Sequence, residues 1–320
     1  MPRKTEIWEP PAAAQAAMSE VNGNAYNGVG ERRARPPKPF FWHPADLHHW
    51  GDMQAYTGRI MFGSEDSEEV MEAFCVDGKP GSYLPRGPAA IEKAPRAPDR
   101  DAAGWTEAVK AFALDNHADD VGVAALNPNW VFEGYELDLP WVISVAVQHD
   151  YDELKHAPSF PGDNRCIIEV GRQYTRAAVA ANTLRNFILS NGYEAVSFEG
   201  PRGGALAMIP AAIAGGLGEL GKHHSMIHPR FGSAFRLSAV ATDMPLTPGA
   251  VADFGADEFC MSCQVCTDEC PPAAIVDEKQ WVRDARTAPR AHGDADAAAA
   301  GFCEVGHALF KIDVPFVGAA

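Results

Sequence analysis

Residues 260–271 read Cys-Met-Ser-Cys-Gln-Val-Cys-Thr-Asp-Glu-Cys-Pro, the most informative stretch of this chain. Four cysteines stand here, Cys260, Cys263, Cys266 and Cys270, in the spacing C-x2-C-x2-C-x3-C-P. This spacing lets three thiolates of one tight loop bind three irons of a cubane. The stretch therefore predicts a 4Fe–4S cluster, and with it an electron-transfer role.

A zinc site is the alternative interpretation of these cysteines. Zinc usually takes two close pairs of ligands that lie far apart in the sequence, whereas here the pairs overlap in a single loop. The last cysteine of such a motif typically serves a second cluster, so the first three need a remote partner, and Cys303 is the one downstream candidate. Two clusters would take about eight thiolates, so the sequence supports one complete cluster and leaves a second open. Cys75 and Cys166 are interpreted as small buried core residues.

The overall composition is that of an ordinary globular protein with an acidic surface. The 320 residues carry 27 Lys and Arg against 43 Asp and Glu, a formal charge of -16, which argues against a nucleic-acid partner. Seven cysteines, four of them clustered, suit a metal centre in a reducing compartment. No apolar h-region follows Arg32-Arg33, and the longest apolar run, Trp141–Val147, is too short to span a membrane. We therefore expect a cytoplasmic protein without a membrane span.

Hydrophobic periodicity divides the chain into three parts. Residues 1–104 are rich in Pro and Gly and are expected to be partly irregular. A mixed core of helices and strands is predicted over residues 105–252, followed by a cysteine-rich module over 253–320. Helical spacing marks 105–113, 174–189 and 205–213, and strand patterns mark 119–124, 141–147, 193–198 and 235–241. The fold class expected is α+β.

A glycine-rich segment lies between the predicted helix at 205–213 and the cysteines. Gly216, Gly218 and Gly221 have the spacing G-x-G-x-x-G of a dinucleotide fingerprint. That fingerprint must follow a strand and open a helix, whereas these glycines come at the end of a helix. We instead expect them to allow close backbone approach to something large and flat.

The order of several motifs resembles that of the cobalamin-dependent reductive dehalogenases, over about residues 105–303. The segments that carry the resemblance are Gly171–Tyr174, Ile209–Lys222, Ile227–Gly232, Arg236-Leu237, Thr242–Leu246 and the cysteine motif. The related epoxyqueuosine reductases share a Gly-Leu-Gly-x-x-Gly-Lys segment and the cluster motif. Their substrate is a tRNA base, which suits this acidic chain poorly.

The resemblance implies a nitroreductase-like cobalamin-binding domain followed by a ferredoxin-like iron–sulfur module. It implies base-off cobalamin held by Gly216, Gly218, Gly221, His223 and Gly232. A small organohalide would be the substrate, and a ferredoxin or a reductase would be the external electron donor. Without a recognised export signal, the chain resembles the soluble, catabolic branch of the family.

The resemblance also implies a catalytic pair, Tyr174 with Lys222 as its basic partner. A cation beside a phenol lowers its pKa and lets it deliver a proton during halide removal. A core tyrosine and a solvated lysine are the simpler interpretations of these two residues. Because no cysteine follows Cys303, the module is either incomplete or truncated. A non-catalytic protein that binds a corrinoid or a cluster therefore remains an alternative.

Overall fold

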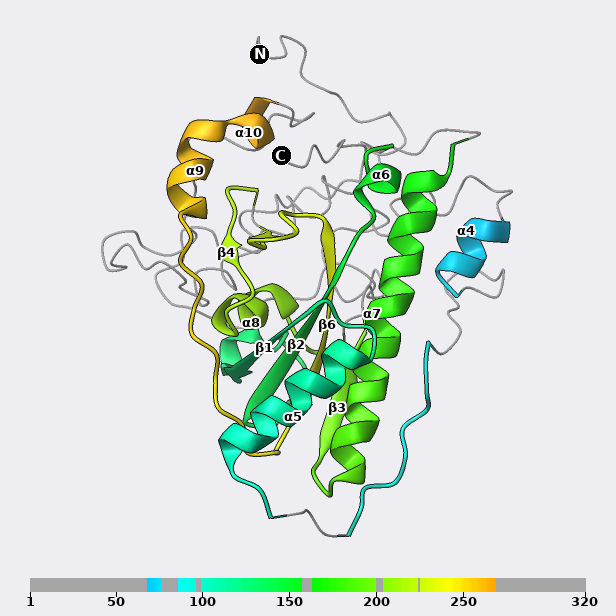
Figure 1. Ribbon diagram of the computed structural model, residues 1–320, viewed down its shortest axis with the longest axis vertical. Coiled ribbons are helices and arrows are strands. Elements are labelled where there is room, and N and C mark those ends of the chain that lie inside the picture. Colours follow the sequence, from blue (N-terminus) through cyan, green and yellow to red (C-terminus); the bar gives the residue numbers. More distant parts are fainter. Residues whose placement is uncertain are drawn as a thin grey trace.

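The computed structural model describes residues 68–75, 86–95, 99–156, 163–199, 204–223 and 225–268. Its centre is an antiparallel four-stranded sheet with strand order β1-β2-β6-β3 (Figure 1). Helices cover both faces of this sheet, so the fold has three layers. The strands are β1 (Asp120–Ala125), β2 (Trp141–Gln148), β3 (Ala195–Phe198) and β6 (Phe235–Thr242).

The two central strands are buried along nearly their whole length because both of their faces are covered. All of Val142–Val147 is buried in β2, and all of Leu237–Thr242 is buried in β6. The two strands pair in a register that sets Ile143 opposite Val240. A strand that packs on both faces has no need of alternating polar residues.

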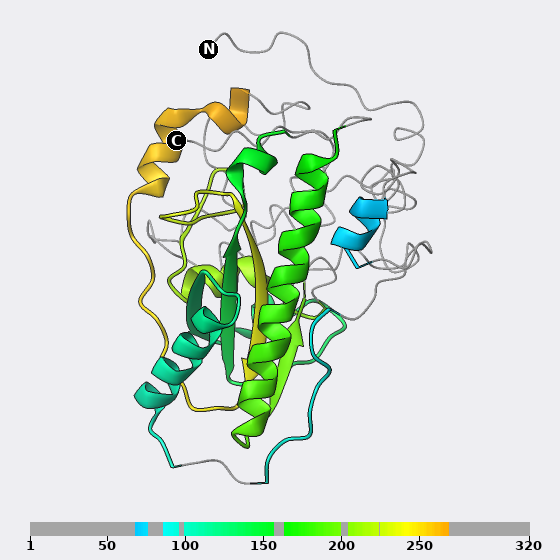
Figure 2. The same cartoon turned by 45° about the vertical axis from the view of Figure 1, so that its right-hand side comes forward.

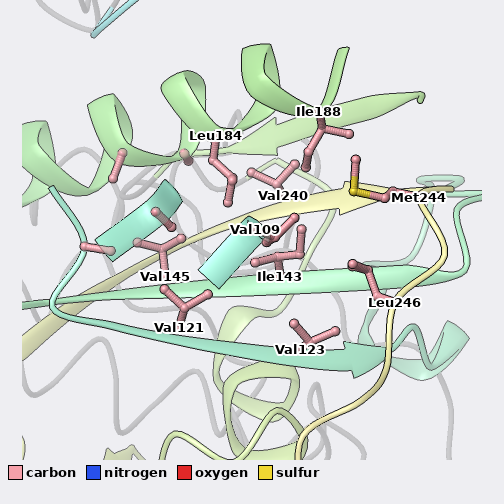
Figure 3. Close-up of a cluster of buried hydrophobic side chains, with 14 of the residues drawn as sticks. Val109, Val121, Val123, Ile143, Val145, Leu184, Ile188, Val240, Met244 and Leu246 are labelled. Atoms are coloured by element: carbon pink, nitrogen blue, oxygen red, sulfur yellow. The ribbon is translucent and has the colours of Figure 1, made fainter. Parts of the chain in front are cut away.

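Helices α5 (Ala102–Asp115) and α7 (Arg165–Ser190) lie on one face of the sheet, with α7 running along the strands (Figure 2). The largest core cluster lies between these helices and the sheet (Figure 3). Leu184 and Ile188 of α7 meet Val145 and Val240 there, and all four side chains are fully buried. Burial of such side chains supplies most of the stability of a fold of this size.

Helix α8 (Met208–Ala214) lies on the opposite face, and a short hairpin of β4 (Glu219–Leu220) and β5 (Met226–Ile227) follows it. The helix packs closely because glycines meet at the contact. A Cβ on Gly122 of β1 would lie 2.8 Å from the carbonyl oxygen of Gly215. This face carries the glycine-rich segment.

Two pieces of the Pro- and Gly-rich N-terminal part pack along α7. Helix α4 (Glu68–Ala73) leads to Phe74, which is fully buried against α7, where a Cβ on Gly171 would lie 2.7 Å from its ring. Farther along α7, Asn182 Nδ2 donates a hydrogen bond of 2.6 Å to the carbonyl oxygen of Arg86. The described residues of this N-terminal part are therefore joined to the core.

The predicted α+β class is confirmed, and the predicted strands match β1, β2, β3 and β6 to within two residues at each end. The predicted helix at 174–189 was too short, since α7 begins at Arg165. Helix α4, the β4–β5 hairpin and the helices around the cysteines were not predicted. Two short elements flank β2, namely η2 (Pro128–Trp130) and α6 (Tyr151–Leu154). After β6 the chain forms two further short helices, α9 (Ala256–Cys263) and α10 (Val265–Asp268).

Candidate functional site

The first three cysteines of the motif lie on two consecutive short helices, α9 and α10. Cys260 and Cys263 are three residues apart on α9, so their side chains share one side of that helix. Gln264 then takes a left-handed conformation with φ of 55° and turns the chain into α10, which carries Cys266. None of the three cysteines forms a disulfide bond with another described residue, and Cys260 is buried. Soft thiols spaced along one short stretch are a donor set that suits an iron–sulfur cluster.

The rest of the predicted ligand set cannot be placed, because Cys270 and Cys303 lie outside the described residues. Within the described ranges, no three His, Cys, Asp or Glu side chains are gathered as they would be around a metal ion. The five cysteines named from the sequence therefore stay predicted ligands.

Gly216 directly follows Gly215, the C-cap residue of helix α8. Its φ is 87°, its N–H bonds the carbonyl of Ile213, and the N–H of Leu217 bonds the carbonyl of Ala212. This pair of hydrogen bonds is a Schellman motif, in which glycine is favoured because it takes positive φ without strain. The conformation of Gly216 is thus explained by the end of a helix, in agreement with the sequence argument against a dinucleotide fingerprint.

Gly218 and Gly221 make close approaches within the β4–β5 hairpin itself. A Cβ on Gly218 would lie 2.2 Å from the carbonyl oxygen of Ile227, and one on Gly221 would lie 2.3 Å from the ring of His223. The N–H of Gly221 also donates to the carbonyl of Ser225 at 2.7 Å. Both glycines are needed for packing within the chain, whatever else approaches them.

Of the other two residues proposed for the cofactor, His223 lies in the loop between β4 and β5, and Gly232 follows β5. His223 is buried, and its Nε2 lies 2.9 Å from Ser233 Oγ. Gly232 has a φ of 57°, and a Cβ there would meet no atom within 4 Å among the described residues. The backbone at Gly232 is therefore open to approach next to a polar pair.

The hairpin contacts the cysteine helix through Glu219 and Lys222, both of which are buried. Glu219 Oε2 accepts a hydrogen bond of 2.7 Å from the N–H of Ala256, the first residue of α9. Lys222 Nζ donates to Oε1 of Gln264, the residue that follows α9. The glycine-rich segment and the cysteine helix are thus in direct contact.

Tyr174 lies in α7 and is buried, with 8% of its surface exposed. Its ring centre is 6.0 Å from that of Phe74, and the guanidinium carbon of Arg236 lies over it, 4.8 Å from the centre. Strand β6 supplies this arginine, which lies opposite Val147 in the sheet. The cation that the structure places on the Tyr174 ring is therefore Arg236, while the contact described for Lys222 is Gln264.

A buried histidine and glutamate lie near Arg236. His149 Nδ1 is 3.1 Å from Glu169 Oε1, which also accepts the N–H of Asp150 at 2.7 Å. Burial, together with the positive charge of Arg236, lowers the pKa of His149 from 6.5 to about 4, so the imidazole is neutral at pH 7. Its Nδ1–H then donates to Glu169, and its Nε2 is a buried acceptor with no hydrogen-bond partner among the described residues.

The depressed pKa of His149 predicts acid sensitivity. Between pH 6.5 and about 4 the unfolded chain takes up a proton on this histidine and the folded chain does not, so stability falls as the pH falls. We expect His149 to account for about 3 kcal/mol of the unfolding free energy lost across this window. Urea unfolding at pH 7 and pH 4.5 should show a shallower loss in His149→Asn than in the native protein. Equal slopes in His149→Asn and in the native protein would contradict the assignment.

Three of the residues that organise this region, Glu219, His149 and Arg236, were not singled out from the sequence. Arg236 and Glu219 both lie in segments that carry the family resemblance, and this location could have identified them as candidate functional residues. His149 directly follows a long apolar strand, where a polar residue often marks a functional edge.

No helix in the described ranges has the length and apolar character that crossing a membrane requires.

Comparison with known proteins gives no matching family model. A tetrachloroethene reductive dehalogenase of Desulfitobacterium hafniense is 32% identical over 159 residues, which cover 49% of this chain and 27% of the relative. A tetrachloroethene reductive dehalogenase of Sulfurospirillum multivorans is 30% identical over 227 residues, with 59% and 44% covered. An epoxyqueuosine reductase of Synechococcus sp. (strain CC9605) is 41% identical over 71 residues, with 22% and 20% covered. The chain spans less than half the length of each of these relatives.

Solved structures of reductive dehalogenases are also similar to this chain in fold. A catabolic reductive dehalogenase superposes with a TM-score of 0.56 at 21% identity, over 71% of this chain and 33% of its own. A second reductive dehalogenase, studied for B12-dependent dehalogenation, gives a TM-score of 0.53 at 24% identity, over 59% and 28%. The described core is therefore built like part of these enzymes.

Proposed function

We propose, from its similarity to reductive dehalogenases, that this chain is an oxidoreductase that removes halide from a small organohalide. The reaction replaces a carbon–halogen bond by a carbon–hydrogen bond, which consumes two electrons and one proton and releases halide. We propose base-off cobalamin and a 4Fe–4S cluster as the cofactors, and a ferredoxin or a reductase as the external electron donor. A thiol-ligated cluster suits the reducing cytoplasm, where we place the protein.

One observation carries the proposal. The glycine-rich hairpin, which the resemblance assigns to the corrinoid, directly contacts the helix that bears Cys260 and Cys263. Electrons that enter at the cysteines would therefore have a short path to a cofactor held beside the hairpin.

The residues present fit both cofactors. Three cysteines within seven residues suit an iron–sulfur cluster. No described residue lies within 4 Å of a Cβ built at Gly232, so the flat, amide-rimmed corrinoid could lie there, beside the His223–Ser233 pair. Cobalamin bound there would supply the low-potential electrons that removal of halide consumes.

The chain's own residues would supply the proton. In this proposal Tyr174 holds it on the phenol oxygen and transfers it to the carbon that loses halide. The guanidinium of Arg236, over the ring at 4.8 Å, favours the phenolate that this transfer leaves behind. Burial of Tyr174 keeps bulk water from competing for the proton. Lys222, proposed from the family resemblance as the basic partner, would act from the end of the hairpin.

Two alternatives are separable from this proposal. An epoxyqueuosine reductase-like activity has support from a relative that matches 22% of the chain, and the net charge of -16 disfavours its tRNA substrate. A non-catalytic protein that binds a corrinoid or a cluster would load one cofactor without turnover.

Reconstitution under anaerobic conditions with cobalamin, iron and sulfide tests the proposed cofactors. We expect about four irons and one cobalt per chain, because only one set of four thiolates is assigned with Cys260, Cys263 and Cys266. Metal analysis and visible absorbance of the purified protein give both numbers. A count near eight irons would contradict the single cluster, and iron without any cobalt would contradict the dehalogenase proposal.

A further inference from the structure

We propose that Glu219 is a positioning residue for the iron–sulfur cluster: its buried carboxylate fixes the start of the cysteine helix α9 and thereby the placement of Cys260 and Cys263. This inference rests on the proposed function, because it assumes that these cysteines bind a cluster. It adds a role for a residue that touches neither substrate nor metal.

The carboxylate of Glu219 accepts hydrogen bonds from three consecutive backbone N–H groups. Its Oε1 accepts from Phe254 at 2.5 Å and from Gly255 at 3.3 Å, and its Oε2 accepts from Ala256 at 2.7 Å. The side chain is buried, with 3% of the residue exposed. Hydrogen bonds to an ionised oxygen are about twice as strong as neutral ones, and burial strengthens them further.

Helix α9 lacks a cap of its own. The residue at its N-cap is Gly255, which has a φ of 85° and no side chain that could accept the free N–H groups of the first turn. A helix of only eight residues gains little stability from its own hydrogen bonds. Glu219 supplies the missing acceptors from another part of the chain, and its negative charge suits the positive end of the helix.

The other end of the same helix is held by the same segment. Lys222, three residues after Glu219, donates to the side chain of Gln264, which follows Cys263 in the left-handed conformation. The segment between Glu219 and Lys222 is itself anchored, because β4 pairs with β5 and Gly218 lies against the carbonyl of Ile227. The cysteine helix is therefore held at both ends by one short piece of chain.

Glu219 should affect the cluster in two ways, through the position of the thiols and through its own negative charge. Ala256 and Cys260 are four residues apart on α9, which is about 6 Å along the axis, so a shift of the first turn moves the thiols. A carboxylate held at the first turn of the cysteine helix also disfavours the more negative, reduced state of a cluster. Loss of its charge should therefore raise the midpoint potential of the cluster.

The test compares Glu219→Ala, Glu219→Gln and Glu219→Asp with Glu107→Gln, a control at an exposed position of α5. Hydrogen exchange at the amides of residues 254–256 is measured in iron-free protein, and the midpoint potential and electron paramagnetic resonance spectrum are measured after reconstitution. We expect exchange about 10- to 100-fold faster in Glu219→Ala, the factor for charged hydrogen bonds. Glu219→Asp should restore part of the protection, and Glu219→Gln should show a more positive potential. The Glu107→Gln control should match the native protein in all three measurements.

Exchange within twofold of the native rate in both Glu219→Ala and Glu219→Gln would overturn the proposal. Faster exchange with an unchanged potential and spectrum would overturn it as well, because the helix would then not govern the cluster. If Glu219→Ala fails to fold, Glu219→Gln, which has nearly the same shape, decides alone. Failure of the native protein to bind iron would overturn the proposed function itself, and this is distinguishable because the exchange measurement needs no iron.

Discussion

The Tyr174→Phe variant is expected to bind cobalamin normally and to lose dehalogenation by roughly 10²- to 10⁴-fold, the usual contribution of a positioned general acid. Phenylalanine keeps the ring, its contact with Phe74 and the face that meets Arg236, so the fold should survive. Only the hydroxyl is removed. Halide release under reducing conditions and the cobalamin absorbance of the same sample give the two quantities.

A second tyrosine provides the matched control. Tyr193 lies just beyond the far end of α7 and packs edge-on against Trp105, with ring centres 5.4 Å apart. Tyr193→Phe should therefore turn over within a few-fold of the native protein. Arg236→Met should reduce turnover in the same direction as Tyr174→Phe, and the two losses should not add, since both act on one proton transfer. Activity of Tyr174→Phe close to native, with cobalamin bound, would show that the proton comes from another group.

The Cys263→Ser variant is expected to lose the visible cluster absorbance and nearly all bound iron, while Cys166→Ser keeps both. Cys263 stands on α9 next to the left-handed turn at Gln264, in the middle of the predicted ligand set. Burial raises the pKa of Cys166 to about 11, and its neighbours Leu154 and Ala234 are apolar. A protonated thiol in such surroundings is a poor iron ligand.

Iron content and absorbance after reconstitution measure both variants. Retention of the cluster in Cys263→Ser would mean that the motif does not ligate it. Its loss in Cys166→Ser, with the fold intact by circular dichroism, would place a ligand in the core.

The central layers of the fold were predictable because local sequence determines them. Strands β2 and β6 are mostly apolar, and the part of α7 beyond Tyr174 repeats its apolar residues at helical spacing. The beginning of α7 was missed because it contains a glycine, Gly171, and charged residues. That glycine is present because Phe74, from a distant segment, packs against it.

The functional region was predictable in its residue types and less so in its contacts. The cysteine spacing identifies a metal centre from sequence alone. In contrast, the ring of Tyr174 meets Arg236 only because α7 packs on β6. Glu219 reaches α9 only because the two-residue strands β4 and β5 pair in one register. Strands this short are too short to show an alternating hydrophobic pattern in the sequence.

Residues 68–75 and 86–95, which pack along α7, determine how the protein can be shortened. Phe74 packs against the ring of Tyr174, and the backbone between Arg86 and Ala94 forms hydrogen bonds with Asn182, Arg185 and Leu189 of the same helix. An expression fragment that begins at residue 105 would strip this cover and leave the apolar flank of α7, with the proposed acid, facing solvent. Fragments meant for crystallisation or spectroscopy should therefore begin upstream of Glu68.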